Sequence, residues 1–161
     1  MILQYKHSIK SHLKRWLFLV TGIFRSEKRL LKQLRFTIGE QYENYEFVLN
    51  SKGEKTINGI CYEIYLYEKG DFKTLFDLPI SRGIVLLFNA DILSAVYYRF
   101  QGNHFEYLLN EINSYLPKNR RMVIDPFVAY RATCNLDSNT VLELLVKKDG
   151  NTGIALKNNR I

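Results

Sequence analysis

Apolar residues recur at intervals of three and four positions along the N-terminal part of the chain. They are Ile9, Leu13, Trp16, Leu17, Val20, Ile23, Phe24, Leu30, Leu31, Leu34 and Ile38. This spacing places them on one side of an α-helix. Glu27 interrupts the stripe, and Ser26 is a favoured helix N-cap. The pattern therefore predicts two helices, over about residues 6–24 and 27–37, or one helix kinked near residue 25.

Beyond residue 46 the pattern changes to that of short strands. The polar cluster 50–53 is typical of a turn. From Thr56 to Tyr67 the side chains alternate, which predicts a strand in a hairpin. If Ile64 and its apolar neighbours fill the core, Tyr65 and Tyr67 lie on the opposite, less buried face. A short helix capped by Asp71 and continuing through Phe76 is expected next.

The middle of the chain combines a buried strand with a second helix. The continuous apolar run 84–88 predicts a central strand buried on both faces. Residues 92–100 are expected to return as a strand, with a helix over 90–100 as the alternative. Val96, Tyr97 and Tyr98 favour the strand. Asn103 is a suitable N-cap for an amphipathic helix that ends at Pro117.

The C-terminal third is expected to be β. Residues 122–124 and 127–134 are strand-like on either side of Asp125-Pro126, and residues 141–147 alternate. The Asp-Gly dipeptide in 148–151 indicates a hairpin turn before a last strand over 154–156. The whole chain is predicted to be a single α+β domain. It has a basic helical segment, 1–40, and a mixed, mostly β segment, 41–161. A mainly antiparallel sheet would carry the N-terminal amphipathic helix or helix pair and one later helix packed on it.

The positive charge lies in the first quarter of the chain. Residues 1–40 carry nine Lys and Arg side chains against Glu27 and Glu40, so their net charge of +7 equals that of the whole chain. Such a segment attracts nucleic acid, anionic lipid or an acidic protein surface. The candidate anion-binding residues are Lys6, Lys10, Lys14 and Arg15. The alternative is that they form the solvated side of a helix packed on the sheet.

No cofactor, metal or catalytic motif is found. The nine glycines form neither a P-loop nor a dinucleotide fingerprint. Cys61 and Cys134 lie far apart in the sequence, which suits buried apolar residues in a reducing, cytoplasmic compartment better than a metal site or a nucleophile. A ribonuclease-like site using His12 with Lys10 or Lys14 stays open, because such sites have no fixed spacing. The apolar run 16–24 is too short to span a bilayer, and no residues typical of a signal-peptide cleavage site follow it.

Eleven tyrosines are present, and tyrosine is enriched in protein interfaces as well as in strands. Tyr65, Tyr67 and Tyr97 are the candidate partner-binding residues. These features together predict a non-enzymatic protein-binding module. Bacterial immunity proteins, which neutralise a cognate toxin, are one class of small α+β proteins with tyrosine-rich sheet faces and no active-site motif. Nucleic-acid binding through the N-terminal helices and peripheral membrane association are the alternatives. The oligomeric state stays open.

Overall fold

The structure is a computed structural model, and it describes residues 28–161. The described chain contains two α-helices, over residues 28–34 and α2 (Phe105–Tyr115), and three 3₁₀ turns, η1 (Tyr42–Asn44), η2 (Glu46–Val48) and η3 (Lys118–Arg120). The strands are β1 (Leu49–Ile57), β2 (Ile60–Tyr67), β3 (Thr74–Leu75), β4 (Leu78–Pro79), β5 (Ile84–Asn89), β6 (Ile92–Phe100), β7 (Val123–Ile124), β8 (Arg131–Asn135), β9 (Thr140–Val146) and β10 (Thr152–Asn158).

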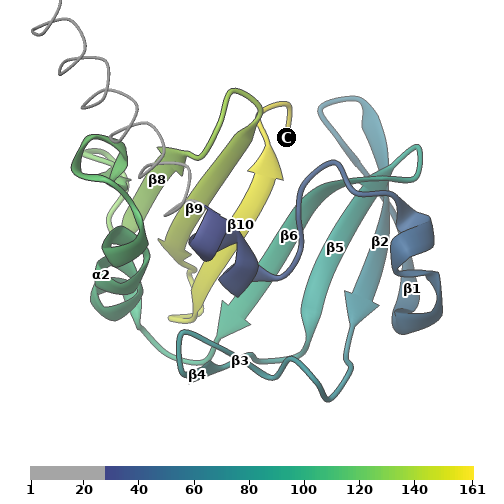
Figure 1. The fold of residues 1–161 in the computed structure, drawn as a ribbon, viewed down its shortest axis with the longest axis horizontal. Helices are drawn as coiled ribbons and strands as arrows, with labels where there is room; N and C mark the ends of the chain where they lie inside the picture. The colour runs from purple at the N-terminus through teal and green to yellow at the C-terminus, as the bar shows by residue number, and fades with distance from the viewer. Residues whose placement is uncertain (1–27) are drawn as a thin grey trace, which may run out of the picture.

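Eight strands form one antiparallel sheet in the order β1-β2-β5-β6-β10-β9-β8-β7, and β3 pairs with β4 in a separate hairpin. The sheet is strongly twisted, and helix 28–34 lies across one of its faces, with α2 beside β8 and β9 (Figure 1). The predicted α+β class with a large antiparallel sheet is therefore confirmed for the described residues. The C-terminal strand β10 lies inside the sheet, where it joins β6 to β9.

The main core lies between the sheet and the described helices. Leu30 and Leu34 of the first helix and Leu108 and Ile112 of α2 are fully buried in it. The sheet contributes alternate residues from its strands, such as Leu86, which is also fully buried. A smaller second cluster on the opposite face contains Tyr62, Leu87 and Ala95, with Tyr97 and Ile161 packed against them. The described helices contribute no residue to this second cluster, so they cover only one face of the sheet.

Several predicted elements are confirmed. Residues 84–88 form β5, an interior strand between β2 and β6 with buried side chains on both faces. Residues 92–100 form strand β6 rather than a helix. The helix after Asn103 is α2, but its N-cap is His104, one residue later than predicted; the Asn103 side chain accepts a hydrogen bond of 3.0 Å from the backbone N–H of Phe105. The turn at 148–151 joins β9 to β10, as its Asp-Gly dipeptide predicts.

Two local predictions are wrong. Residues 50–53 are part of β1 and contain a β-bulge between Ser51 and Gly53, where Gly53 has a φ of +99°. The turn itself is Asn58-Gly59, with both residues at positive φ as a two-residue hairpin requires. Residues 71–76 do not form a helix capped by Asp71. They lead into the β3–β4 hairpin, whose turn is Phe76-Asp77.

The expected strand over 127–134 begins only at residue 131. Residues 127–130 form a loop before β8, because backbone N–H groups at Phe127 and Val128 donate to the side chain of the preceding Asp125 and close a turn there. The expected helix over 27–37 ends at residue 34, and Arg35 leaves it with a φ of +67°. The expected helix over 6–24 and the proposed cap Ser26 lie outside the described residues. Among residues 28–161, no helix is both long and apolar enough to cross a bilayer.

Candidate functional site

The exposed apolar residues of the described chain are concentrated at one edge of the sheet. Eight large hydrophobic side chains are exposed within residues 28–161, and five of them fall in the short span 123–130. These five are Val123, Ile124, Phe127, Val128 and Tyr130, and we call them the β7 surface. Val123 is 70% exposed and Phe127 is 93% exposed. Contiguous exposed apolar residues of this kind mark interaction sites more often than single exposed side chains do.

Asp125 fixes the conformation of the loop that carries Phe127. Its Oδ1 accepts hydrogen bonds from the backbone N–H groups of Phe127, at 2.9 Å, and Val128, at 3.2 Å. Its Oδ2 lies 3.4 Å from Nη1 of Arg131, and its own N–H donates to the Arg131 carbonyl at 2.8 Å. Pro126 restricts the backbone further. Phe127 is therefore presented to solvent on an ordered turn, and little backbone conformational entropy remains to be lost when it binds.

Tyr130 connects this loop to the rest of the domain. Its ring packs edge-on against Phe105 at the start of α2, with ring centroids 5.7 Å apart. Its carbonyl accepts a hydrogen bond of 2.9 Å from the N–H of Val146. The β7 surface is thus joined to α2 on one side and to the end of β9 on the other.

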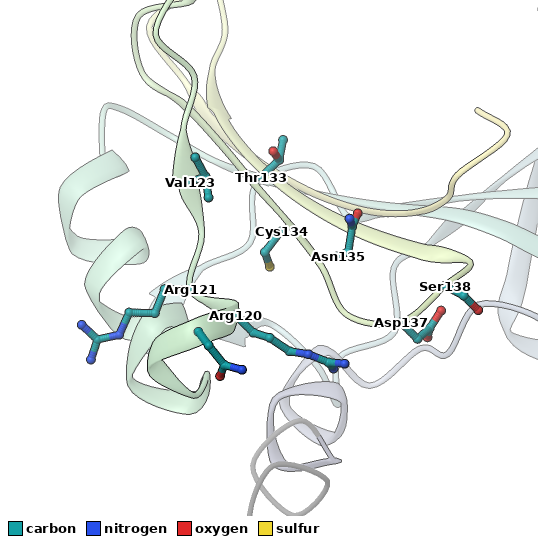
Figure 2. A pocket seen from close by; sticks show the side chains of 9 residues that line it. Arg120, Arg121, Val123, Thr133, Cys134, Asn135, Asp137 and Ser138 are labelled. Atoms are coloured by element: carbon teal, nitrogen blue, oxygen red, sulfur yellow. The ribbon is translucent and has the colours of Figure 1, made fainter. Parts of the chain in front are cut away.

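A pocket of about 430 Å³ adjoins the β7 surface at Val123. It opens at the start of β7, where β8 extends beyond β7 and pairs only with β9, between the segment 119–121 and the β8–β9 turn (Figure 2). Arg120 extends beneath Cys134 towards Asp137, and its Nη1 donates to the Leu136 carbonyl at 3.1 Å. Arg121 extends away from the pocket, on the outer side of the chain. Both arginines line the pocket, and Arg121, two residues before Val123, also lies at the border of the β7 surface.

The sheet face not covered by the described helices has a charged centre. Glu143 accepts hydrogen bonds of 2.7 Å from Nε of Arg131 and from Nζ of Lys157. Burial raises the pKa of its carboxyl, but the hydrogen bonds and charges of Lys157 and Arg131 outweigh burial, so that the pKa lies below its ordinary value. Glu143 is therefore a structural anion, and Arg131 joins it to Asp125 under the β7 surface.

The structure corrects the expected positions of two candidate tyrosines. Tyr65 and Tyr67 point into the main core and not away from it. Tyr67 is only 2% exposed. Tyr65 is half-buried and lies between Tyr42 and Phe88, at centroid distances of 4.9 and 5.6 Å. The hydroxyl of Tyr65 donates to Glu63 at 2.7 Å, and this hydrogen bond, with burial, raises the pKa of the phenol.

The alternation along β2 is regular, but the sequence does not show which of its two faces meets the helices. Tyr62 is buried on the second face, where apolar residues also gather. The third candidate, Tyr97, is half-buried in the same cluster as Tyr62. Both faces of β2 therefore carry buried apolar side chains. The face with more aliphatic residues belongs to the second cluster, and the face with Tyr65 and Tyr67 lies under the helices.

The four basic candidates Lys6, Lys10, Lys14 and Arg15 lie outside the described residues, as does His12. Within the described part of the chain, no cluster of three His, Cys, Asp or Glu side chains is arranged to hold a metal ion. Cys134 is buried as expected, but the expected burial of Cys61 is wrong, since Cys61 is exposed; the two form no disulfide with each other.

Sequence analysis missed the β7 surface. Its signal was the segment Asp-Pro-Phe-Val-Ala-Tyr, in which a turn dipeptide precedes apolar residues that fit neither helical nor strand periodicity. Such a segment is a candidate for an exposed apolar loop.

No family model, no curated protein and no solved structure matches the chain.

Proposed function

We propose that this chain is a non-enzymatic protein-binding module that docks its partner on the β7 surface. The observation that carries the proposal is Phe127, an aromatic side chain exposed almost completely on a turn that Asp125 and Arg131 hold in place. Aromatic anchors of this kind dominate the binding free energy of many interfaces. The surrounding Val123, Ile124, Val128 and Tyr130 supply an apolar area that would exclude water around that anchor.

Bacterial immunity proteins, which bind and neutralise a toxin, are the class we propose for this module. Their task requires a stable scaffold and one specific protein-binding surface, and it needs no catalytic group. The cytoplasm is the compartment we propose, since Cys61 is exposed and forms no disulfide with Cys134. Nucleic-acid binding by the basic segment 1–40 and attachment to a membrane surface are the competing functions, both supported only by charge and apolar pattern.

Site-specific photo-crosslinking tests the proposal. The photoreactive analogue benzoylphenylalanine replaces Phe127 in one variant and Phe47 in the other, and both are expressed in the native host. Phe47 is the matched control because it is a phenylalanine with 90% exposure that lies in η2, away from the β7 surface. We expect a protein that crosslinks at position 127 and not at position 47.

The captured protein must then be purified and its dissociation constant measured. Phe127→Ala should weaken binding by about thirtyfold or more, as expected for an interface anchor. Phe47→Ala should leave the affinity unchanged. A partner whose affinity is equal for wild type and Phe127→Ala would exclude the β7 surface as the docking site. Crosslinks at position 127 to lipid or nucleic acid would favour one of the competing functions.

A further inference from the structure

The border of the β7 surface is basic, although residues 41–161 as a whole carry no net charge. Arg121 lies two residues before β7, and Lys118 lies in η3 just ahead of it; both are exposed. On the other side, the N–H of Val146 donates to the carbonyl of Tyr130, so the backbone at Lys147 and Lys148 leaves the sheet beside Tyr130, while the end of the Lys147 side chain lies near Gly153 of β10. These two lysines are also exposed.

The carboxylates closest to this border in the chain are already paired with other cations. Asp125 is bound to Arg131, and Asp149 is bound to Arg99. None of the ion pairs between residues 28–161 includes Lys118, Arg121, Lys147 or Lys148. The exposed Glu106, which follows the Tyr130 contact Phe105, is the acid on the α2 side of this surface, so the four cations at the border still outnumber it.

From this charge arrangement we infer that the partner of the β7 surface is an acidic protein surface, with carboxylates around an apolar site that receives Phe127. This inference rests on the proposed function and specifies its partner. Like charges facing each other across an interface are unfavourable, whereas complementary charges accelerate association. Positive charge at the border and an apolar centre therefore select for acidic partners and against basic ones.

The same argument disfavours two other occupants. A second copy of this chain would place Lys147, Lys148 and Arg121 opposite cations of the same kind. Residues 1–27 of the chain itself carry a net charge of +4, with Glu27 their only acidic residue. An external acidic partner fits the border better than either.

Peptide selection tests the inference even while the partner is unidentified. A phage library of random short peptides is selected on the full chain, and each enriched peptide is tested again on Phe127→Asp. We expect the peptides that need Phe127 to contain more Asp and Glu than Lys and Arg. Raising the NaCl concentration about tenfold, to roughly 0.5 M, should weaken the best of them, because exposed charges are screened by salt.

Charge reversal provides the matched comparison. Lys147→Glu/Lys148→Glu should weaken the best acidic peptide by about tenfold or more, because it reverses the field beside Phe127. Lys52→Glu/Lys55→Glu makes the same change of charge in β1, at the opposite edge of the sheet, and should leave the affinity unchanged. An equal loss in both variants would mean that net charge acts without a local site, and would overturn the inference.

The different failures are distinguishable. Phe127-dependent peptides that are neutral or basic would overturn the acidic partner but leave protein binding by the β7 surface intact. If no enriched peptide depends on Phe127, the proposed function fails and the inference fails with it. Mixed vesicles of phosphatidylcholine and phosphatidylserine are the third arm, with pure phosphatidylcholine vesicles as their control. Phe127-dependent binding to the mixed vesicles, without Phe127-dependent peptides, would overturn the inference and identify an anionic membrane, rather than an acidic protein, as what the β7 surface binds.

Discussion

The hydroxyl of Tyr67 donates a hydrogen bond of 2.6 Å to Oδ1 of Asp71. Nη2 of Arg35 lies 2.8 Å from the other carboxylate oxygen, and the guanidinium carbon lies 4.9 Å from the centre of the Tyr67 ring. Arg35 immediately follows helix 28–34, and Tyr67 ends β2. Asp71 therefore connects the end of the first described helix to the sheet, because its carboxylate binds both Arg35 and Tyr67.

Neutralising Asp71 should lower stability in a pH-dependent way. The hydrogen bond from Tyr67 and the charge of Arg35 hold the pKa of Asp71 below its ordinary value. A lowered pKa stabilises the fold above the unfolded-state pKa of about 3.9, and this contribution disappears as the pH falls through the folded-state value. Asp71→Asn should melt below wild type at pH 7, and the difference should close under acid. Asp91→Asn, in the exposed turn between β5 and β6, is the control. A difference that persists at pH 2 would show that the charge is not responsible.

Glu143, the anion at the centre of the second sheet face, is expected to contribute more to stability than Asp71. Glu143→Gln would leave Arg131 and Lys157 without their shared carboxylate, and it should cost about 1–3 kcal/mol of unfolding free energy in urea titrations. Glu43→Gln, in the exposed turn η1, should change little. Glu143→Leu combined with Lys157→Met should recover part of the loss, because it removes the carboxylate together with its more buried cation and leaves Arg131 paired with Asp125. A double variant less stable than Glu143→Gln would contradict this explanation.

Two adjacent tyrosines on β6 should differ in their sensitivity to loss of the hydroxyl. Tyr98 is buried, and its hydroxyl donates to the carbonyl of Leu34 at the end of the first helix. The Leu34 carbonyl also accepts a hydrogen bond of 2.8 Å from the N–H of Phe36, so Tyr98→Phe removes one of its two hydrogen bonds and should cost about 0.5–1.5 kcal/mol. Tyr97→Phe removes a hydroxyl from the opposite, half-open face and should change stability by about 0.5 kcal/mol or less. Equal effects in denaturant titrations would mean that the Leu34 hydrogen bond contributes nothing.

Two glycines provide a test of backbone constraint. Gly83 has a φ of +74°, and a Cβ there would lie 2.9 Å from the carbonyl oxygen of Tyr67. Gly83→Ala should therefore cost more than about 1 kcal/mol, since both the conformation and the contact oppose it. At Gly153 the nearest atom to an added Cβ is 3.4 Å away, at the end of the Lys147 side chain. Gly153→Ala should be tolerated to within about 1 kcal/mol, because a flexible side chain can move aside. Calorimetric melting of both variants checks the contrast.

Tyr67, expected on the less buried face of the sheet, is buried in the core, whereas Phe127 is almost fully exposed. Tyr67→Ala should cost about 3–5 kcal/mol of stability, as other large-to-small aromatic substitutions in cores do. Phe127→Ala should change stability by about 0.5 kcal/mol or less, because the ring contacts mainly solvent. Thermal melting measures both. A stability loss at Phe127 comparable with that at Tyr67 would show that the loop packs on the domain.

The sequence by itself determined most of the local elements. Strands β5, β6 and β9, helix α2 and the turn at 148–151 follow from signals within a few residues: an apolar run, an alternation, a helical period and an Asp-Gly pair. Such signals are local because side-chain periodicity and turn chemistry act over short stretches of backbone. Most of the predictions that the structure confirms used only these local signals.

Tertiary structure decided the rest. β10 pairs with β6 although α2, β7, β8 and β9 lie between them in the chain, and no local pattern specifies that pairing. The face of β2 that meets the core was decided by where the first helix lies, because both faces of that strand are apolar. The exposure of Phe127 likewise depends on Asp125, whose side chain closes a turn where an apolar segment would otherwise continue β8. Burial is a property of the assembled sheet and helices, so the candidate site became visible only in three dimensions.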